Sequence, residues 1–144
     1  MRLPALVLAL TAACTANPDV DPHAVQTAEG GRICPLPEQL ARFTEGAEFT
    51  VRVLVAECIS QCAREVVATC STRIAPDRTL TLDARATWLP ARGGEMCPSS
   101  CKRVFADCPI LGLTPGTYSL RSGVHSLSLD LPSTSPPVVD PSCL

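Results

Sequence analysis

The chain has 144 residues, and 46% of them are hydrophobic although only 3% are aromatic. Its formal net charge is -2 at pH 7 and it has no concentrated basic patch, which argues against a nucleic-acid partner. This length allows one domain of ordinary size. With so few aromatic rings, the core must consist mainly of Val, Leu, Ala and cystine, and we expect disulfides to supply much of its stability.

The first 14 residues, MRLPALVLALTAAC, have the pattern of a secretory signal. Arg2 gives a positive start, an apolar run follows from Leu3 to Leu10, and small residues lead to Cys14. The run is too short to span a bilayer, which needs roughly 20 apolar residues. We therefore predict a signal peptide over residues 1–13.

The stretch LTAAC at residues 10–14 resembles the lipobox of bacterial lipoproteins, with threonine at a position where leucine is usual. The resemblance implies that the signal is cut before Cys14, that Cys14 carries lipid, and that the protein is anchored in the bacterial cell envelope. Because no aspartate follows the cysteine, it also implies the outer membrane. Each buried methylene of an acyl chain contributes about 0.8 kcal/mol, so several chains anchor firmly. Simple secretion after cleavage near Ala13 or Ala16 is the alternative.

Residues 14–32 are predicted to be the lipidated cysteine followed by a flexible spacer. They are rich in Pro, Asp and small residues and show no apolar periodicity. His23 lies near several acidic residues, but a flexible spacer offers no rigid scaffold for metal ligands, so we interpret this group as solvated. The folded domain is expected over residues 33–144.

From residue 49 onward the sequence alternates as β-strands do. In EFTVRVLVAE, four apolar side chains share one face: Phe49, Val51, Val53 and Val55. Residues 66–74 and 80–88 predict a hairpin that turns around Pro76-Asp77. Three pairs then share its inward face: Ile74 with Leu80, Cys70 with Ala84, and Val66 with Trp88.

The last third of the chain predicts three more strands. The first has Val104, Ala106 and Cys108 on one face, and TYSLRSGVHSLSLDL predicts a hairpin that turns at Ser122-Gly123. That turn places two pairs opposite each other: Tyr118 with Leu127, and Leu120 with His125. The remainder is rich in Pro and Ser and irregular up to Cys143. Six short strands predict an all-β fold, a small disulfide-stapled antiparallel β-sandwich or open barrel.

The stretch LTPGTY at residues 113–118 resembles the start of a late strand in many immunoglobulin-like β-sandwich domains. The spacing of Cys70 and Cys108 is too short for the bridge of a true immunoglobulin domain, so the resemblance implies a related sandwich. Two cysteine triplets followed by PGTY also resemble cysteine-rich lipoproteins of GC-rich bacteria, a resemblance that implies no known activity.

The two cysteine segments, CISQCAREVVATC at 58–70 and CPSSCKRVFADC at 97–108, also fit helical spacing. We favour strands because Val66 and Val67 are β-branched and because Pro98 and Pro109 bracket the second segment. Neither segment has the C-x-x-C spacing of thioredoxin-type redox sites or of most zinc sites. Disulfides are therefore the preferred use of these cysteines, and a redox or metal-handling role of the C-x3-C pairs is the alternative.

Assigning Cys14 to lipid leaves an even set of disulfide candidates: Cys34, Cys58, Cys62, Cys70, Cys97, Cys101, Cys108 and Cys143. An even set in an exported domain indicates a disulfide framework. Sequence alone leaves about 105 pairings open. The inward faces of the strands favour Cys70 with Cys108. Cys34 with Cys143 would then join the termini, and the repeated motif suggests that Cys58 and Cys62 pair with Cys97 and Cys101.

Motifs of catalysis are missing from the sequence: it has no G-x-S-x-G, no H-E-x-x-H, no phosphate-binding glycine loop and no Rossmann fingerprint. We expect no catalytic residues, no metal and no cofactor. His125, the only histidine of the domain, is interpreted as a strand residue. The preferred function is a non-catalytic binding or structural module of the envelope. Its rigid loops at residues 58–62 and 92–101 would meet an envelope or extracellular protein or a glycan. A secreted inhibitor with a cystine-braced loop is a further alternative.

Overall fold

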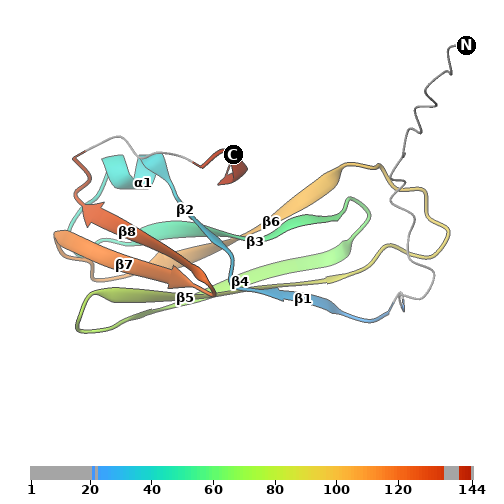
Figure 1. Ribbon diagram of the computed structural model, residues 1–144, viewed down its shortest axis with the longest axis horizontal. Helices are drawn as coiled ribbons and strands as arrows, with labels where there is room; N and C mark the ends of the chain where they lie inside the picture. Colours follow the sequence, from blue (N-terminus) through green and yellow to red (C-terminus); the bar gives the residue numbers. More distant parts are fainter. Residues whose placement is uncertain (1–20, 22, 135–139, 144) are drawn as a thin grey trace, which may run out of the picture.

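The computed structural model describes residues 21, 23–134 and 140–143, so the predicted signal peptide and Cys14 lie outside the described residues. Within these ranges the chain folds into two packed β-sheets with one short helix and one 3-10 turn (Figure 1). This confirms the all-β sandwich. Eight strands are present where the sequence predicted six, because two short strands precede residue 49.

The first sheet contains five strands: β1 (Gln26–Glu29), β4 (Arg64–Ile74), β5 (Thr79–Leu89), β7 (Gly116–Ser122) and β8 (His125–Leu131). The second contains β2 (Arg32–Pro35), β3 (Phe49–Ser60) and β6 (Cys101–Ile110). Helix α1 (Pro37–Ala41) follows β2, and the 3-10 turn η1 (Pro141–Cys143) lies near the C-terminus. β4 pairs along one edge of β5, while β1 and β7 share the other edge, one after the other. The β5–β7 pair is parallel, so the expectation of a wholly antiparallel sandwich is wrong at this one contact.

The core lies between the sheets and is made of aliphatic side chains and cystine. Val51 and Val53 of β3 are fully buried, as are Leu80 of β5, Leu120 of β7 and Cys108 of β6. Burying a side chain of this size contributes about 1.5–3 kcal/mol to stability. The inward-facing residues whose alternation predicted these strands are therefore also the residues that form the core. The predicted alternation ends early in β3. Leu54 is buried and Val55 only half-buried, because a register shift interrupts the β3–β6 ladder between residues 54 and 56.

The β4–β5 hairpin has the predicted register over most of its length. Ile74 pairs with Leu80 and Cys70 with Ala84, but the prediction that Ile74 faces inward is wrong, since its side chain is exposed at the end of β4. The ladder is interrupted between residues 64 and 67, where Glu65 adopts a positive φ of 51°. A bulge therefore replaces the expected pair of Val66 with Trp88, although both side chains still pack against the smaller of the two hydrophobic clusters.

The β7–β8 hairpin turns one residue later than predicted, which shifts the cross-strand pairing by two residues. Its two-residue loop is Gly123-Val124, so Tyr118 pairs with Leu129 and Ser122 with His125. Gly123 has a φ of 57°, and the first loop position of a tight hairpin favours glycine at positive φ. A shift of two residues leaves every side chain on the same face, so hydrophobic alternation cannot distinguish the two registers.

The predicted spacer over residues 14–32 is wrong at its C-terminal end. Gln26–Glu29 forms β1 against β5, and β2 already begins at Arg32 in the other sheet. The chain crosses between sheets at Gly30-Gly31, where Gly31 has a φ of 144° and a Cβ would lie 2.1 Å from the carbonyl oxygen of Leu54. Only glycine fits this crossing, because any side chain would collide with β3.

Candidate binding site

The eight predicted cysteines form four disulfides: Cys34–Cys143, Cys58–Cys101, Cys62–Cys97 and Cys70–Cys108. Their Cα–Cα distances range from 4.8 to 5.8 Å, within the range usual for disulfides. Cys70–Cys108 and Cys34–Cys143 are the pairs expected from the sequence. The repeated motif left open which of Cys58 and Cys62 joins Cys97 and which joins Cys101, and the structure pairs Cys58 with Cys101 and Cys62 with Cys97. Both cysteine segments lie largely on strands β3, β4 and β6, as preferred over helices.

Two disulfides, Cys58–Cys101 and Cys62–Cys97, lie at one end of the sandwich. We call the residues of this end, 58–62 and 92–101, the braced end. Cys58 and Cys101 are exposed, and Met96 in the connecting loop is 98% exposed. One carboxylate oxygen of Glu95 and the sulfurs of Cys62 and Cys97 lie within 4.8 Å of one another. Because these two sulfurs are bonded to each other, neither is the thiolate that a metal ion requires. The geometry therefore supports a structural disulfide at this position.

The two long sides of the sandwich differ. On one side β4 and β6 meet, joined by Cys70–Cys108 and by a hydrogen bond of 2.8 Å from the Thr72 hydroxyl to the Pro109 carbonyl oxygen. On the other side the first sheet ends at β8 and the second at β2. These two strands lie toward the viewer in Figure 1. We call these the closed side and the open side.

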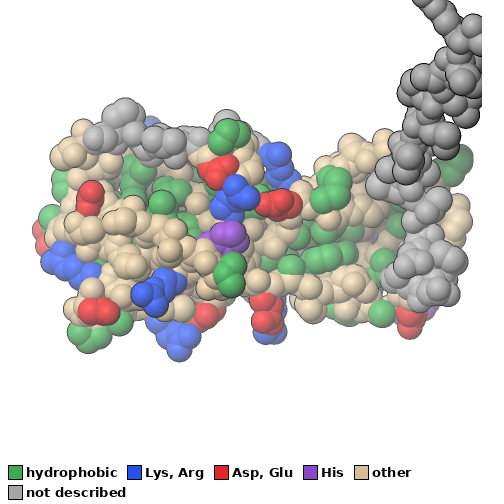
Figure 2. Space-filling view, viewed as in Figure 1, with side chains coloured by type: hydrophobic (Ala, Val, Ile, Leu, Met, Phe, Trp, Pro, Cys, Tyr) green, Lys and Arg blue, Asp and Glu red, His purple; other side chains and the backbone are tan. Residues whose placement is uncertain are grey.

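A groove of about 690 Å³ runs along the open side between β8 and β2, and we call it the β8 groove. Its walls include residues 125–130 of β8, residues 32–35 of β2, Leu40 of α1, residues 133–134, and Asp140, Pro141 and Cys143 near the C-terminus. Figure 2 views this side and shows acidic, basic and histidine side chains gathered over β2 and the start of β8. The groove thus combines a leucine-rich interior with a polar rim.

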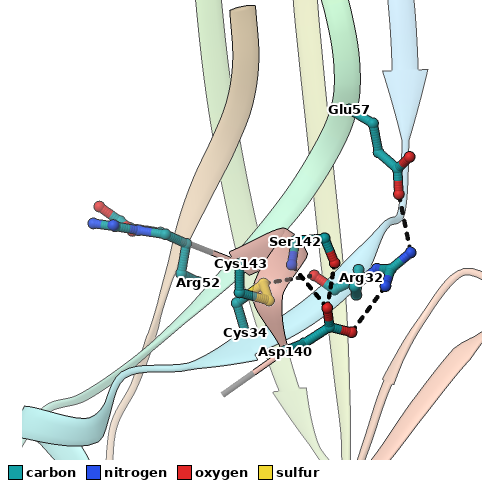
Figure 3. The surroundings of a disulfide bond; sticks show 8 residues. Arg32, Cys34, Arg52, Glu57, Asp140, Ser142 and Cys143 are labelled. Atoms are coloured by element: carbon teal, nitrogen blue, oxygen red, sulfur yellow. Dashed lines mark hydrogen bonds and ion pairs between the residues drawn. A yellow bond between two sulfur atoms is a disulfide. The ribbon is translucent and has the colours of Figure 1, made fainter.

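An ion-pair network holds the C-terminal wall of the groove in place (Figure 3). Arg32 donates hydrogen bonds to Asp140 at 2.8 Å and to Glu57 at 3.0 Å. The other carboxylate oxygen of Asp140 accepts hydrogen bonds from the backbone N–H of Ser142, at 2.9 Å, and from its hydroxyl. Together with Cys34–Cys143, these bonds tie η1 to β2.

The same contacts set the charges of this network. The hydrogen bonds from Ser142, followed by those from Arg32, hold the pKa of Asp140 well below its usual range. Asp140 and Glu57 in turn raise the pKa of the Arg32 guanidinium. Asp140 and Arg32 are therefore both charged at neutral pH, and the Arg32 guanidinium already bonds two carboxyl groups.

The other residues singled out from the sequence do not assemble into a site. His125 is exposed at the start of β8 and lines the groove, without a cysteine thiol beside it, since the cysteines of the described residues are disulfide-bonded. No sequence pattern points to the groove, because its two walls come from segments about 90 residues apart.

Comparison with known proteins adds no further assignment. No family model, no curated protein and no solved structure matches the chain. Among the residues described here, no helix is both long and apolar enough to cross a bilayer.

Proposed function

We propose that the protein is a lipid-anchored, non-catalytic binding module of the bacterial cell envelope. The observation that carries the proposal is a two-sheet sandwich held by four disulfides whose open side carries a groove. Disulfides persist in oxidising compartments such as the envelope, and a rigid scaffold around a preformed groove suits recognition. The lipobox-like LTAAC at residues 10–14 supports attachment through Cys14.

The anchor bears on which surface meets a partner. The chain from Cys14 to Gln26 can reach at most about 40 Å when fully extended. β1 begins beside the braced end, since Gln26 pairs with Trp88 and Arg64 pairs with Leu89 on the same stretch of β5. Under the proposal, the braced end faces the membrane. The β8 groove, on the open side, is then a better candidate for a partner site than the loops favoured by the sequence.

The competing function, redox or metal handling at the C-x3-C pairs, draws on one observation. Cys58 and Cys101 are both exposed, so a dithiol reductant in the envelope has access to their disulfide. A binding module needs all eight domain cysteines to stay oxidised, whereas a redox site needs one pair to cycle between disulfide and dithiol.

The deciding experiment is the intact mass of the protein extracted from bacterial membranes, with thiols alkylated before and after reduction. We expect no label before reduction, eight labels after it, and a mass increment for lipid at the N-terminus. Cys14→Ala should lose that increment and leave the membrane fraction, while the four disulfides are unchanged. Labelling of one cysteine pair before reduction would favour the redox function, and a soluble, unmodified wild-type protein would overturn the anchor.

A further inference from the structure

β8 ends its sheet with one edge unpaired by any other described strand. It pairs with β7 alone, from Ser122 opposite His125 to Gly116 opposite Leu131. The residues that flank a two-residue hairpin loop form a hydrogen-bonded pair, and such pairs then alternate along the ladder. His125, Leu127, Leu129 and Leu131 therefore bond to β7. The main-chain N–H and C=O groups of the residues between them, Ser126, Ser128 and Asp130, point to the other edge.

The β8 groove runs along that edge and not over a face of the sheet. Successive side chains of a strand point to opposite faces, so a cavity over one face would contact every second residue. The groove instead contacts six successive residues of β8, 125–130, and four successive residues of β2, 32–35. Its walls are therefore the edges of two strands, and the main chain of β8 is accessible within it.

This edge carries no lysine, proline or bulge, three of the features by which proteins protect an edge strand. Natural edge strands carry lysine, proline or a bulge that prevents pairing with another chain. The sequence of β8, HSLSLDL, has no lysine and no proline, and its ladder with β7 has no register shift. In contrast, β6 carries Lys102, Arg103 and Pro109, and it lies on the closed side. The unprotected edge and the groove coincide on the open side.

The charges around the groove favour one kind of occupant. Arg32 is the only lysine or arginine among the lining residues, and its guanidinium is engaged by Asp140 and Glu57. Asp130 adds a further carboxylate to the wall, held by the Thr117 hydroxyl at 2.6 Å. The rim therefore carries a net negative charge, while the side chains of Leu127 and Leu129 pack against the hydrophobic core between the sheets.

We propose that the β8 groove binds an extended segment of a partner protein as an added strand on β8, and that this segment carries lysine or arginine among alternating apolar residues. The proposal rests on the binding function proposed above and names its partner class. β8 has seven residues and is about 24 Å long, so the partner segment spans roughly six to eight residues. Main-chain pairing at Ser126, Ser128 and Asp130 supplies affinity, and the acidic rim selects the basic side chains.

The test is a selection from a displayed library of random ten-residue peptides on the oxidised, lipid-free protein. We expect enriched peptides that alternate apolar and polar residues and contain lysine or arginine. Ser128→Pro removes one main-chain donor of the free edge and no bond to β7, so a selected peptide should bind this variant about tenfold more weakly. Ser128→Thr keeps the donor and is the matched control, with affinity unchanged. Asp130→Asn should reduce the preference for basic residues.

Amide hydrogen exchange provides a second measurement that does not depend on how well Ser128→Pro folds. The amides of Ser126, Ser128 and Asp130 should exchange quickly in the free protein and slow at least about tenfold with a selected peptide, while Leu127 and Leu129 are slow in both states. Enriched peptides that protect other strands, or a library that yields none, overturn the proposal even if the protein is anchored and fully oxidised. Protection of the same amides in the free protein also overturns it. If dilution abolishes that protection, a second copy is the occupant.

Discussion

The partly buried disulfide Cys70–Cys108 should be the most important single bond across the closed side. It links β4 to β6, and Cys108 is fully buried in the core. We consider the double variant Cys70→Ala/Cys108→Ala, which removes the bond without leaving free thiols. The free energy of unfolding should fall because the unfolded chain gains entropy and because two sulfur atoms no longer fill the closed side.

The other disulfides determine how much entropy is gained. Without Cys70–Cys108, the shortest covalent path between residues 70 and 108 runs about 8 residues back to Cys62 and about 11 residues on from Cys97. A loop of about 19 residues corresponds to about 3 kcal/mol in the chain-entropy relation, less than the figure of about 4 for the isolated loop. The lost packing adds roughly 1 kcal/mol, so we expect a total near 4 kcal/mol.

The assay is urea unfolding followed by circular dichroism without reductant, in which about 4 kcal/mol lowers the midpoint by roughly 2.5 M. The matched control is Cys58→Ala/Cys101→Ala, which opens a loop of only about 8 residues and creates no cavity, because both cysteines are exposed. It should cost about 2.5 kcal/mol. A smaller loss for the buried pair than for the exposed pair, or a loss below about 1 kcal/mol, would refute this reasoning.

Three further predictions concern single residues. Gly31→Ala should lower the free energy of unfolding by roughly 2–4 kcal/mol in the same denaturation assay, because its Cβ would collide with a backbone oxygen. The control Gly93→Ala, whose Cβ would lie in open space, should change this free energy by less than about 0.5 kcal/mol. Asp140 has a lowered pKa in the folded protein, so its contribution to stability is present above a pH of about 4 and is lost as the pH falls below that value. Asp140→Asn should therefore reduce the loss of stability in acid, measured by melting curves from pH 7 to pH 2. Tyr118→Phe removes the hydroxyl that bonds the backbone four residues earlier, and thermal melting should show a loss of about 1–2 kcal/mol.

The sequence predicted the parts of this fold that depend on the side-chain period. The β4–β5 register follows from inward residues such as Cys70 and Ala84, because a slip by one residue would turn the whole set to solvent. The side-chain period could not predict the position of the β7–β8 turn, because a shift of the pairing by two residues keeps every side chain on the same face of the sheet. β1 and β2 were missed because each has four residues, too few to show a period.

The candidate site was harder to predict than the fold. The alternation of leucine with serine in HSLSLDL marks a strand without edge protection, but only the topology shows that β8 lies at an edge. The opposite wall depends on Cys34–Cys143, which brings η1 beside β2. The sequence favoured the loops of the braced end because cysteines are visible in a sequence, whereas a free main-chain edge is not.

The disulfide Cys34–Cys143 has a consequence for how the folded chain responds to proteolysis. The two cysteines are separated by 109 residues, and the other three disulfides lie within this loop. A protease that cuts any single peptide bond between them leaves the two pieces covalently joined and the sandwich still stapled. Nicked molecules would therefore run at full length on a non-reducing gel and separate only after reduction.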